Sequence, residues 1–108
     1  MVQLTDREEL KKYVKNHSVV IVKISAEWCG PCRRCAPYVK KMMEYYNKIS
    51  YVEVDADEGR NITSYLKIKT VPTIISYING DIHEILVSSS EDDISSFFQK
   101  TNSYIKNN

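Results

Sequence analysis

Trp28-Cys29-Gly30-Pro31-Cys32 is the most informative segment of the chain, because it places two thiols three positions apart where a strand pattern gives way to a helix pattern. If Cys29 lies at the first turn of that helix, Cys32 follows about one turn later and the two sulfurs can close a small disulfide ring. Pro31 lacks an N–H group and suits a first helical turn, and Gly30 lets a partner backbone approach closely. The spacing therefore predicts thiol–disulfide exchange.

The two cysteines are predicted to play unequal parts. Unpaired N–H groups and the dipole at a helix start favour negative charge, so the Cys29 thiol should ionise below the usual pKa of ~8.5. A fall to ~7 corresponds to roughly 2 kcal/mol of thiolate stabilisation. We therefore expect Cys29 to be the attacking nucleophile and Cys32 to be the resolving cysteine that attacks the mixed disulfide.

The same spacing also fits two other kinds of site. A Cys-x-x-Cys pair can be structural, or it can be half of a zinc site, for which Cys35, His17 and His83 are the remaining soft ligands. The repeat through Cys35 superficially matches iron–sulfur spacing, but the chain has no fourth cysteine. We expect no metal and interpret Cys35 first as a small buried helix residue, with a secondary redox or dimer-forming thiol as the alternative.

Length and composition predict a single domain over 1–108, with an ordinary 43% of hydrophobic residues. Fifteen basic and 14 acidic residues give a net charge of +1, which offers no strong field for nucleic acid or an anionic membrane. No apolar run approaches the ~20 residues that span a bilayer, and the start shows no leader pattern. Three cysteines fit a reducing compartment, so we expect the protein to be cytoplasmic. We also expect a monomer, with no nucleic-acid or membrane partner.

Strand and helix patterns alternate along the chain. Thr5 and Glu8 fit a capping box for a first helix that ends near Asn16, and Asn79-Gly80 predicts a two-residue turn between antiparallel strands. Helical periodicity also covers 32–47, 62–66 and 90–105, and strand patterns cover 19–24, 51–54, 73–78 and 82–87. This order predicts an α/β fold, with a mixed sheet covered by helices on both faces and the cysteines at the carboxyl end of a strand.

The motifs together resemble the thioredoxin family over essentially the whole chain. In order they are Ala26-Glu27-Trp28-Cys29-Gly30-Pro31-Cys32, Pro37, Val54-Asp55, Val71-Pro72-Thr73 and Asn79-Gly80. The resemblance implies the thioredoxin fold, with a central mixed sheet of four to five strands.

Function and site residues follow from the same resemblance as expectations. Family members reduce protein disulfides and are regenerated by an external reductant such as a thioredoxin reductase, so no bound cofactor is implied. Pro72 should follow a cis peptide bond beside the dithiol, Val71 should offer its backbone to a substrate segment, and Trp28 should supply an apolar contact. The Gly-Pro pair between the cysteines resembles reducing thioredoxins (about −270 mV) and not isomerases (about −180 mV), a difference of roughly 4 kcal/mol.

One departure from the family lies on the strand before the cysteines, where Lys23 stands in place of the usual buried Asp. In one interpretation the strand is less covered and Lys23 extends its ammonium to water. In the other, the cation holds nearby sulfurs as thiolates and shifts the redox poise toward oxidation, with Tyr51 or Glu53 on the adjacent strand as its partner. Arg33 is a second candidate modulator, although such a residue is more often simply solvated.

Ser25 and Ser88 are further departures, since relatives carry an aromatic residue and a glycine there. Both changes alter the predicted docking surface, and a side chain at Ser88 would limit how closely a partner backbone approaches, although drift at tolerant positions explains them equally well. These departures leave a second hypothesis open, in which the fold serves as a binding or assembly subunit and the dithiol is dispensable.

Overall fold

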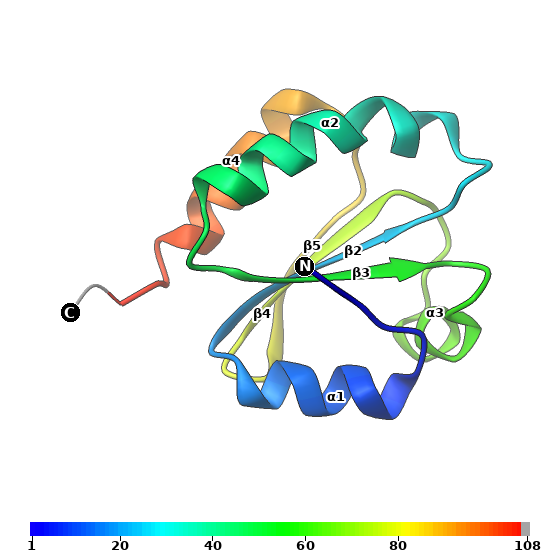
Figure 1. Ribbon diagram of the computed structural model, residues 1–108, viewed down its shortest axis with the longest axis horizontal. Helices are drawn as coiled ribbons and strands as arrows, with labels where there is room; N and C mark the ends of the chain where they lie inside the picture. Colours follow the sequence, from blue (N-terminus) through cyan, green and yellow to red (C-terminus); the bar gives the residue numbers. More distant parts are fainter. Residues whose placement is uncertain (107–108) are drawn as a thin grey trace.

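A central sheet organises the chain, whose computed structural model describes residues 1–106 (Figure 1). Within those residues the sheet has five strands in the order β1-β3-β2-β4-β5. β1, β2 and β3 run parallel, whereas β4 is antiparallel to both β2 and β5. The strands are β1 (Val2–Gln3), β2 (Val19–Ser25), β3 (Ser50–Asp55), β4 (Thr73–Ile78) and β5 (Asp81–Leu86). The mixed sheet of the predicted fold is confirmed; the last two residues of the predicted domain lie outside the described part.

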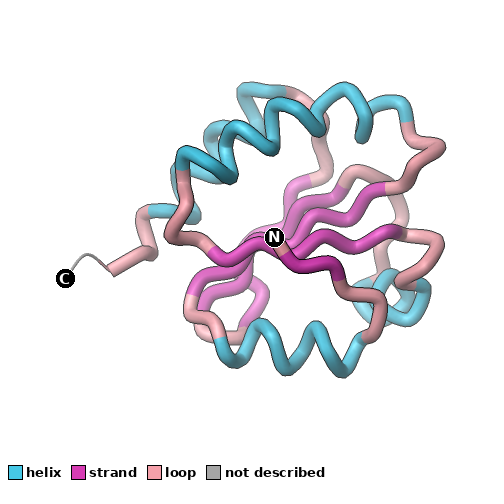
Figure 2. The backbone as a smooth tube through the Cα atoms, in the orientation of Figure 1, coloured by secondary structure: helices cyan, strands magenta, loops and turns pink. Residues whose placement is uncertain are grey.

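Helices cover both faces of the sheet, as Figure 2 shows. α1 (Arg7–Asn16) and α3 (Arg60–Leu66) lie on one face, and α2 (Gly30–Tyr45) and α4 (Glu91–Asn102) lie on the other. None of the helices within residues 1–106 combines the length and the apolar character that a bilayer crossing requires.

β2 lies at the centre because it can bury both of its faces. Val20, Val22 and Ile24 belong to the core against α1 and α3, while Val19 and Ile21 belong to the core against α2 and α4. The nearly continuous β-branched run in the sequence therefore marks the central strand correctly. β2 leads directly into the loop that carries the cysteines.

Two local predictions have different outcomes. Asn79 and Gly80 both have positive φ, 52° and 87°, as the predicted two-residue hairpin turn requires, and they join β4 to β5. The predicted capping box is wrong, because Asp6 and not Thr5 caps α1: its side chain accepts the backbone N–H groups of Glu8 and Glu9.

Helix α2 starts two residues earlier than the sequence pattern predicts. It begins at Gly30 because the side chain of Cys29 serves as its N-cap, and it continues through Pro37 to Tyr45. Pro31 in the first turn agrees with this start, but sulfur is not among the usual capping atoms, so residue preferences do not indicate Cys29 as the cap. The earlier start places both cysteines at the first turn.

Candidate redox site

Cys29 and Cys32 lie where β2 leads into α2, at the carboxyl end of the central strand (Figure 1). The structure joins them in a disulfide, with their Cα atoms 5.3 Å apart. Both residues are nearly buried, at 4% and 3% exposure. The predicted dithiol pair is therefore present as a closed ring at the edge of the core.

The start of α2 presents backbone N–H groups to Cys29. Its Sγ accepts the N–H of Cys32 at 3.2 Å, and its carbonyl accepts the N–H of Arg33 at 3.2 Å. Pro31 occupies the first turn, where a missing N–H costs nothing. A sulfur at this position receives both a hydrogen bond and the positive end of the helix dipole, and both favour a thiolate.

The loop between α3 and β4 contributes Val71 and Pro72 to the site. The peptide bond between them is cis, and Pro72 is buried. The Val71 carbonyl oxygen lies 3.6 Å from Cys29 Sγ, and the Val71 side chain packs against the small cluster of Ala26, Cys29 and Cys32. The structure thus brings these two residues to the cysteines, as the resemblance implied.

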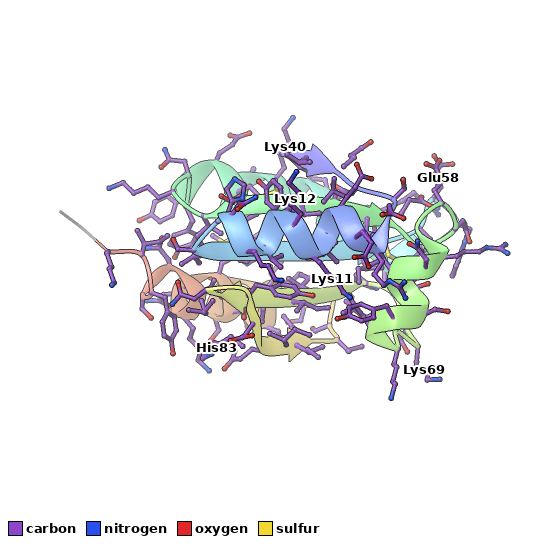
Figure 3. The ribbon with its side chains drawn as sticks, turned by 90° about the horizontal axis from the view of Figure 1, so that it is seen from below. Lys11, Lys12, Lys40, Glu58, Lys69 and His83 are labelled. Atoms are coloured by element: carbon purple, nitrogen blue, oxygen red, sulfur yellow. A yellow bond between two sulfur atoms is a disulfide. The ribbon has the colours of Figure 1, made fainter. Side chains whose placement is uncertain are left out.

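Trp28 is the exposed side chain next to the cysteines, with 67% of its surface in contact with solvent. Its indole N–H donates a hydrogen bond of 2.9 Å to the carboxylate of Asp57. Asp55 accepts the N–H groups of Asp57 and Glu58, which fixes the turn after β3. A large apolar surface is therefore held beside Cys29 by an acidic loop, and Glu58 projects from this end of the molecule in Figure 3.

Lys23 lies on the sheet face that α2 covers, and it lines the same cavity as Cys32. It is 8% exposed and stands opposite Glu53 in the register of β2 with β3. Lys23, Glu53, Ser25 and Cys32 all line one open cavity of about 290 Å³. Ser25 donates its hydroxyl hydrogen to Glu53 at 3.4 Å, which is a long hydrogen bond.

Tyr51, the other predicted partner of Lys23, is engaged elsewhere. Its hydroxyl donates to the carbonyl of Tyr46 at 2.9 Å, and burial raises its pKa, with the charge of Tyr46 adding to the effect. A tyrosine held neutral in this way does not balance a cation. Glu53 therefore remains the predicted partner that lies opposite Lys23 in the strand register, although no salt bridge joins the two within residues 1–106.

Two other predicted site residues make contacts away from the sulfurs. The Arg33 guanidinium donates to the carbonyl of Glu27, although Arg33 also borders the cavity. The Ser88 hydroxyl donates to Asp93 at 2.7 Å and accepts the N–H of Ser90 at 3.0 Å, so it helps to start α4. Gly30 has no positive φ, so its backbone conformation does not by itself require glycine.

The remaining candidate ligands do not converge with the cysteine pair. Cys35 is buried in the core under α2 and donates its S–H to the Cys32 carbonyl at 3.5 Å. His17 stacks on Tyr13, and His83 packs against Tyr104. Within residues 1–106, no three His, Cys, Asp or Glu side chains are grouped so that they could hold a metal ion.

A disulfide-forming cysteine pair at a helix start, beside a cis-proline loop and on a mixed sheet covered on both faces, defines a dithiol–disulfide oxidoreductase.

The family model described as Thioredoxin matches residues 1–100. Thioredoxin-3 of Dictyostelium discoideum is 40% identical over 80 residues, covering 74% of this chain and 76% of that protein. Thioredoxin 1 of Plasmodium falciparum (isolate 3D7) is 31% identical over 97 residues, covering 90% and 93%.

A solved structure of Plasmodium falciparum thioredoxin superposes with a TM-score of 0.88 at 30% identity, covering 93% of this chain and 98% of that one. The chain belongs to the thioredoxin family. It is a protein-disulfide reductase that works through its Cys29–Cys32 dithiol–disulfide couple.

Sequence reasoning did not single out Asp57 as a site residue. Asp57 lies in the turn that follows β3, and its contact with Trp28 spans 29 positions. Local patterns carry no signal for a hydrogen bond between two such loops.

Proposed function

We propose that this protein is a cytoplasmic electron carrier in which Cys29 attacks protein disulfides and Cys32 resolves the intermediate. An external reductant, a thioredoxin reductase or an equivalent dithiol donor, then restores the pair. The observation that carries the assignment of roles is the position of Cys29 as N-cap of α2, with its sulfur accepting the Cys32 N–H.

The reaction transfers two electrons in two exchange steps. The Cys29 thiolate attacks one sulfur of the client disulfide, a mixed disulfide forms, and the first client sulfur leaves as a thiolate. Cys32 then loses its proton to solvent and attacks Cys29 Sγ, and the second client sulfur leaves. The client ends as two thiols, and the protein ends with the Cys29–Cys32 disulfide that the structure contains.

The neighbours of Cys29 suit an extended client segment. Trp28 offers an exposed aromatic surface on one side, and the Val71 backbone lies beside Cys29 Sγ on another. A client backbone that lies along Val71 would bring its disulfide to the one cysteine that the helix start activates. Cys32 is better placed for the second step, because it lies further inside the helix.

A reducing compartment suits the cysteine content. Cys35 is a buried free thiol next to a single exchangeable disulfide, whereas secreted domains of this size commonly use cysteines as structural staples. The net charge of +1 gives no reason to assign a polyanionic partner. These features support the cytoplasm as the location and protein disulfides as the substrates.

Insulin reduction with dithiothreitol as the reductant tests this function. The wild type should precipitate the reduced B chain, Cys29→Ser should have no activity above background, and Cys35→Ala should remain active as the matched cysteine control. An inactive but folded wild type would favour the alternative in which the fold serves only as a binding or assembly subunit.

A further inference from the structure

Lys23 is a buried charged residue that takes no part in the two exchange steps described above. It lies in the middle of the central strand at 8% exposure, where neighbours in sequence are fully buried valine and isoleucine. Because side chains alternate along a strand, Lys23 faces the same way as Val19 and Ile21, toward α2. A charge at such a position carries a desolvation cost that a neutral residue would avoid.

The surroundings of Lys23 connect it to Cys32. Both residues line the open cavity of about 290 Å³ between β2, β3 and the start of α2. Across residues 1–106, no salt bridge involves Lys23, and no fully enclosed side-chain nitrogen lacks a hydrogen-bond partner. The ammonium therefore reaches water, and Lys23 shares the cavity with Cys32. The interpretation that this strand is less covered is wrong, because β2 is buried along its length up to Ile24 and Lys23 itself is 8% exposed.

Other charged groups border the same cavity, and most already have protein partners. Arg33 on α2 contacts the Glu27 carbonyl, and the Asp55 carboxylate on β3 accepts two backbone N–H groups. Glu27 and Glu58 are exposed loop residues. Glu53 faces Lys23 directly across the β2–β3 register. A neighbouring hollow brings Lys40, Glu44 and Tyr51 to the other side of Lys23.

We propose that Lys23 and Glu53 form an opposed pair of positioning residues that sets how readily Cys32 ionises in the resolving step. Burial disfavours the Cys32 thiolate, and the ammonium of Lys23 in the shared cavity offsets that penalty. Glu53 acts in the opposite sense, because its carboxylate weakens the field of Lys23. The inference rests on the proposed role of Cys32, whose proton leaves to cavity water.

Titration of Cys32 alone tests the pair without relying on turnover. In a Cys29→Ser, Cys35→Ala background Cys32 is the single remaining cysteine, and its thiolate absorbance is followed against pH. Lys23→Met, of similar length but uncharged, should raise the titration midpoint by about one pH unit. Lys23→Arg should restore it, and Glu53→Gln should lower it by a smaller amount.

A second readout follows the resolving step itself. With Cys29 and Cys32 both reduced, the protein is mixed rapidly with an aromatic disulfide under single-turnover conditions. The first aromatic thiol leaves when Cys29 attacks, and release of the second, which leaves when Cys32 attacks Cys29 Sγ, is timed at several pH values. Lys23→Met should slow release about tenfold below the midpoint, since a one-unit rise leaves a tenth of the thiolate. Glu53→Gln should speed it.

The opposite signs separate electrostatics from packing. If Lys23→Met and Glu53→Gln both leave the midpoint unchanged, or shift it in the same direction, the proposal is overturned. If Lys23→Met fails to fold, the shift of the Cys32 titration midpoint in Glu53→Gln is sufficient to test the proposal: a midpoint that does not fall overturns it. Loss of insulin reduction would overturn the proposed function without moving the Cys32 titration, so the two failures are distinguishable.

Discussion

The indole N–H of Trp28 donates a 2.9 Å hydrogen bond to the carboxylate of Asp57, and this bond ties the loop before Cys29 to the loop after β3. The two residues are 29 positions apart, and both are exposed. A ring that would otherwise rotate freely in solvent is thereby held at one orientation beside the reactive sulfur. In the client contact that we propose for Trp28, this ordering in advance lowers the entropic cost of binding.

Removal of the Asp57 acceptor should weaken client binding. We expect Asp57→Ala to raise the KM for insulin reduction about fivefold, which corresponds to the loss of a hydrogen bond worth about 1 kcal/mol. The kcat should change little, because the sulfurs are untouched. Asp57→Asn keeps an acceptor oxygen and should stay within about twofold of the wild type. An Asp57→Ala variant with the wild-type KM would show that the orientation of Trp28 does not matter.

Asp6 should make the protein sensitive to acid. The hydrogen bond from Asn61 is the main cause that lowers the pKa of Asp6 below its usual 3.8, and the backbone N–H groups of Glu9 and Glu8 add to it. A lowered pKa in the folded state means that the carboxylate stabilises the fold above about pH 4 and that this contribution is lost as the pH falls further. Asp6→Asn should remove this component from the pH dependence of unfolding.

An NMR titration of the Asp6 carboxyl carbon provides the measurement. In the wild type the midpoint should lie below 3.8, and in Asn61→Ala it should move up toward that value, because the leading hydrogen bond is gone. A wild-type midpoint at or above 3.8 would contradict the capping geometry of α1.

Cys35 should prove structural. It is buried among core side chains beneath α2, so Cys35→Ala should lower the free energy of unfolding in urea by about 1 kcal/mol, as expected for a small buried group. Insulin reduction should stay within about twofold of the wild type. A Cys35→Ala variant that folds but loses turnover would instead support the redox alternative for this thiol.

The fold was predictable because its main signals are local. The buried run of β2, the Asn79-Gly80 turn and the apolar face of α4 each lie within a few consecutive residues. β1 was not predicted, since a strand of two exposed residues has no pattern of its own and exists through its pairing with β3. Helical periodicity puts the start of α2 two residues too late, whereas the cysteine motif itself predicts Cys29 at the helix start.

The sequence predicts which sulfur atoms of the site react better than it predicts which residues surround them. The motif indicated which sulfurs react, and the resemblance implied that Val71 and Pro72 would be nearby. The cavity that joins Lys23, Glu53 and Cys32 depends on strand register and on how α2 lies over the sheet. Ser88 shows the same limit, because its contacts with Asp93 and Ser90 are visible only once α4 is in place.

Trapping of the mixed disulfide shows which of the two cysteines attacks first. Cys32→Ser and Cys29→Ser are each incubated with a disulfide-bonded client, quenched with acid and alkylated, and analysed by mass spectrometry. We expect Cys32→Ser to accumulate client linked to Cys29 and Cys29→Ser to accumulate none. A client adduct on Cys32 in Cys29→Ser, with no adduct in Cys32→Ser, would contradict this order of attack.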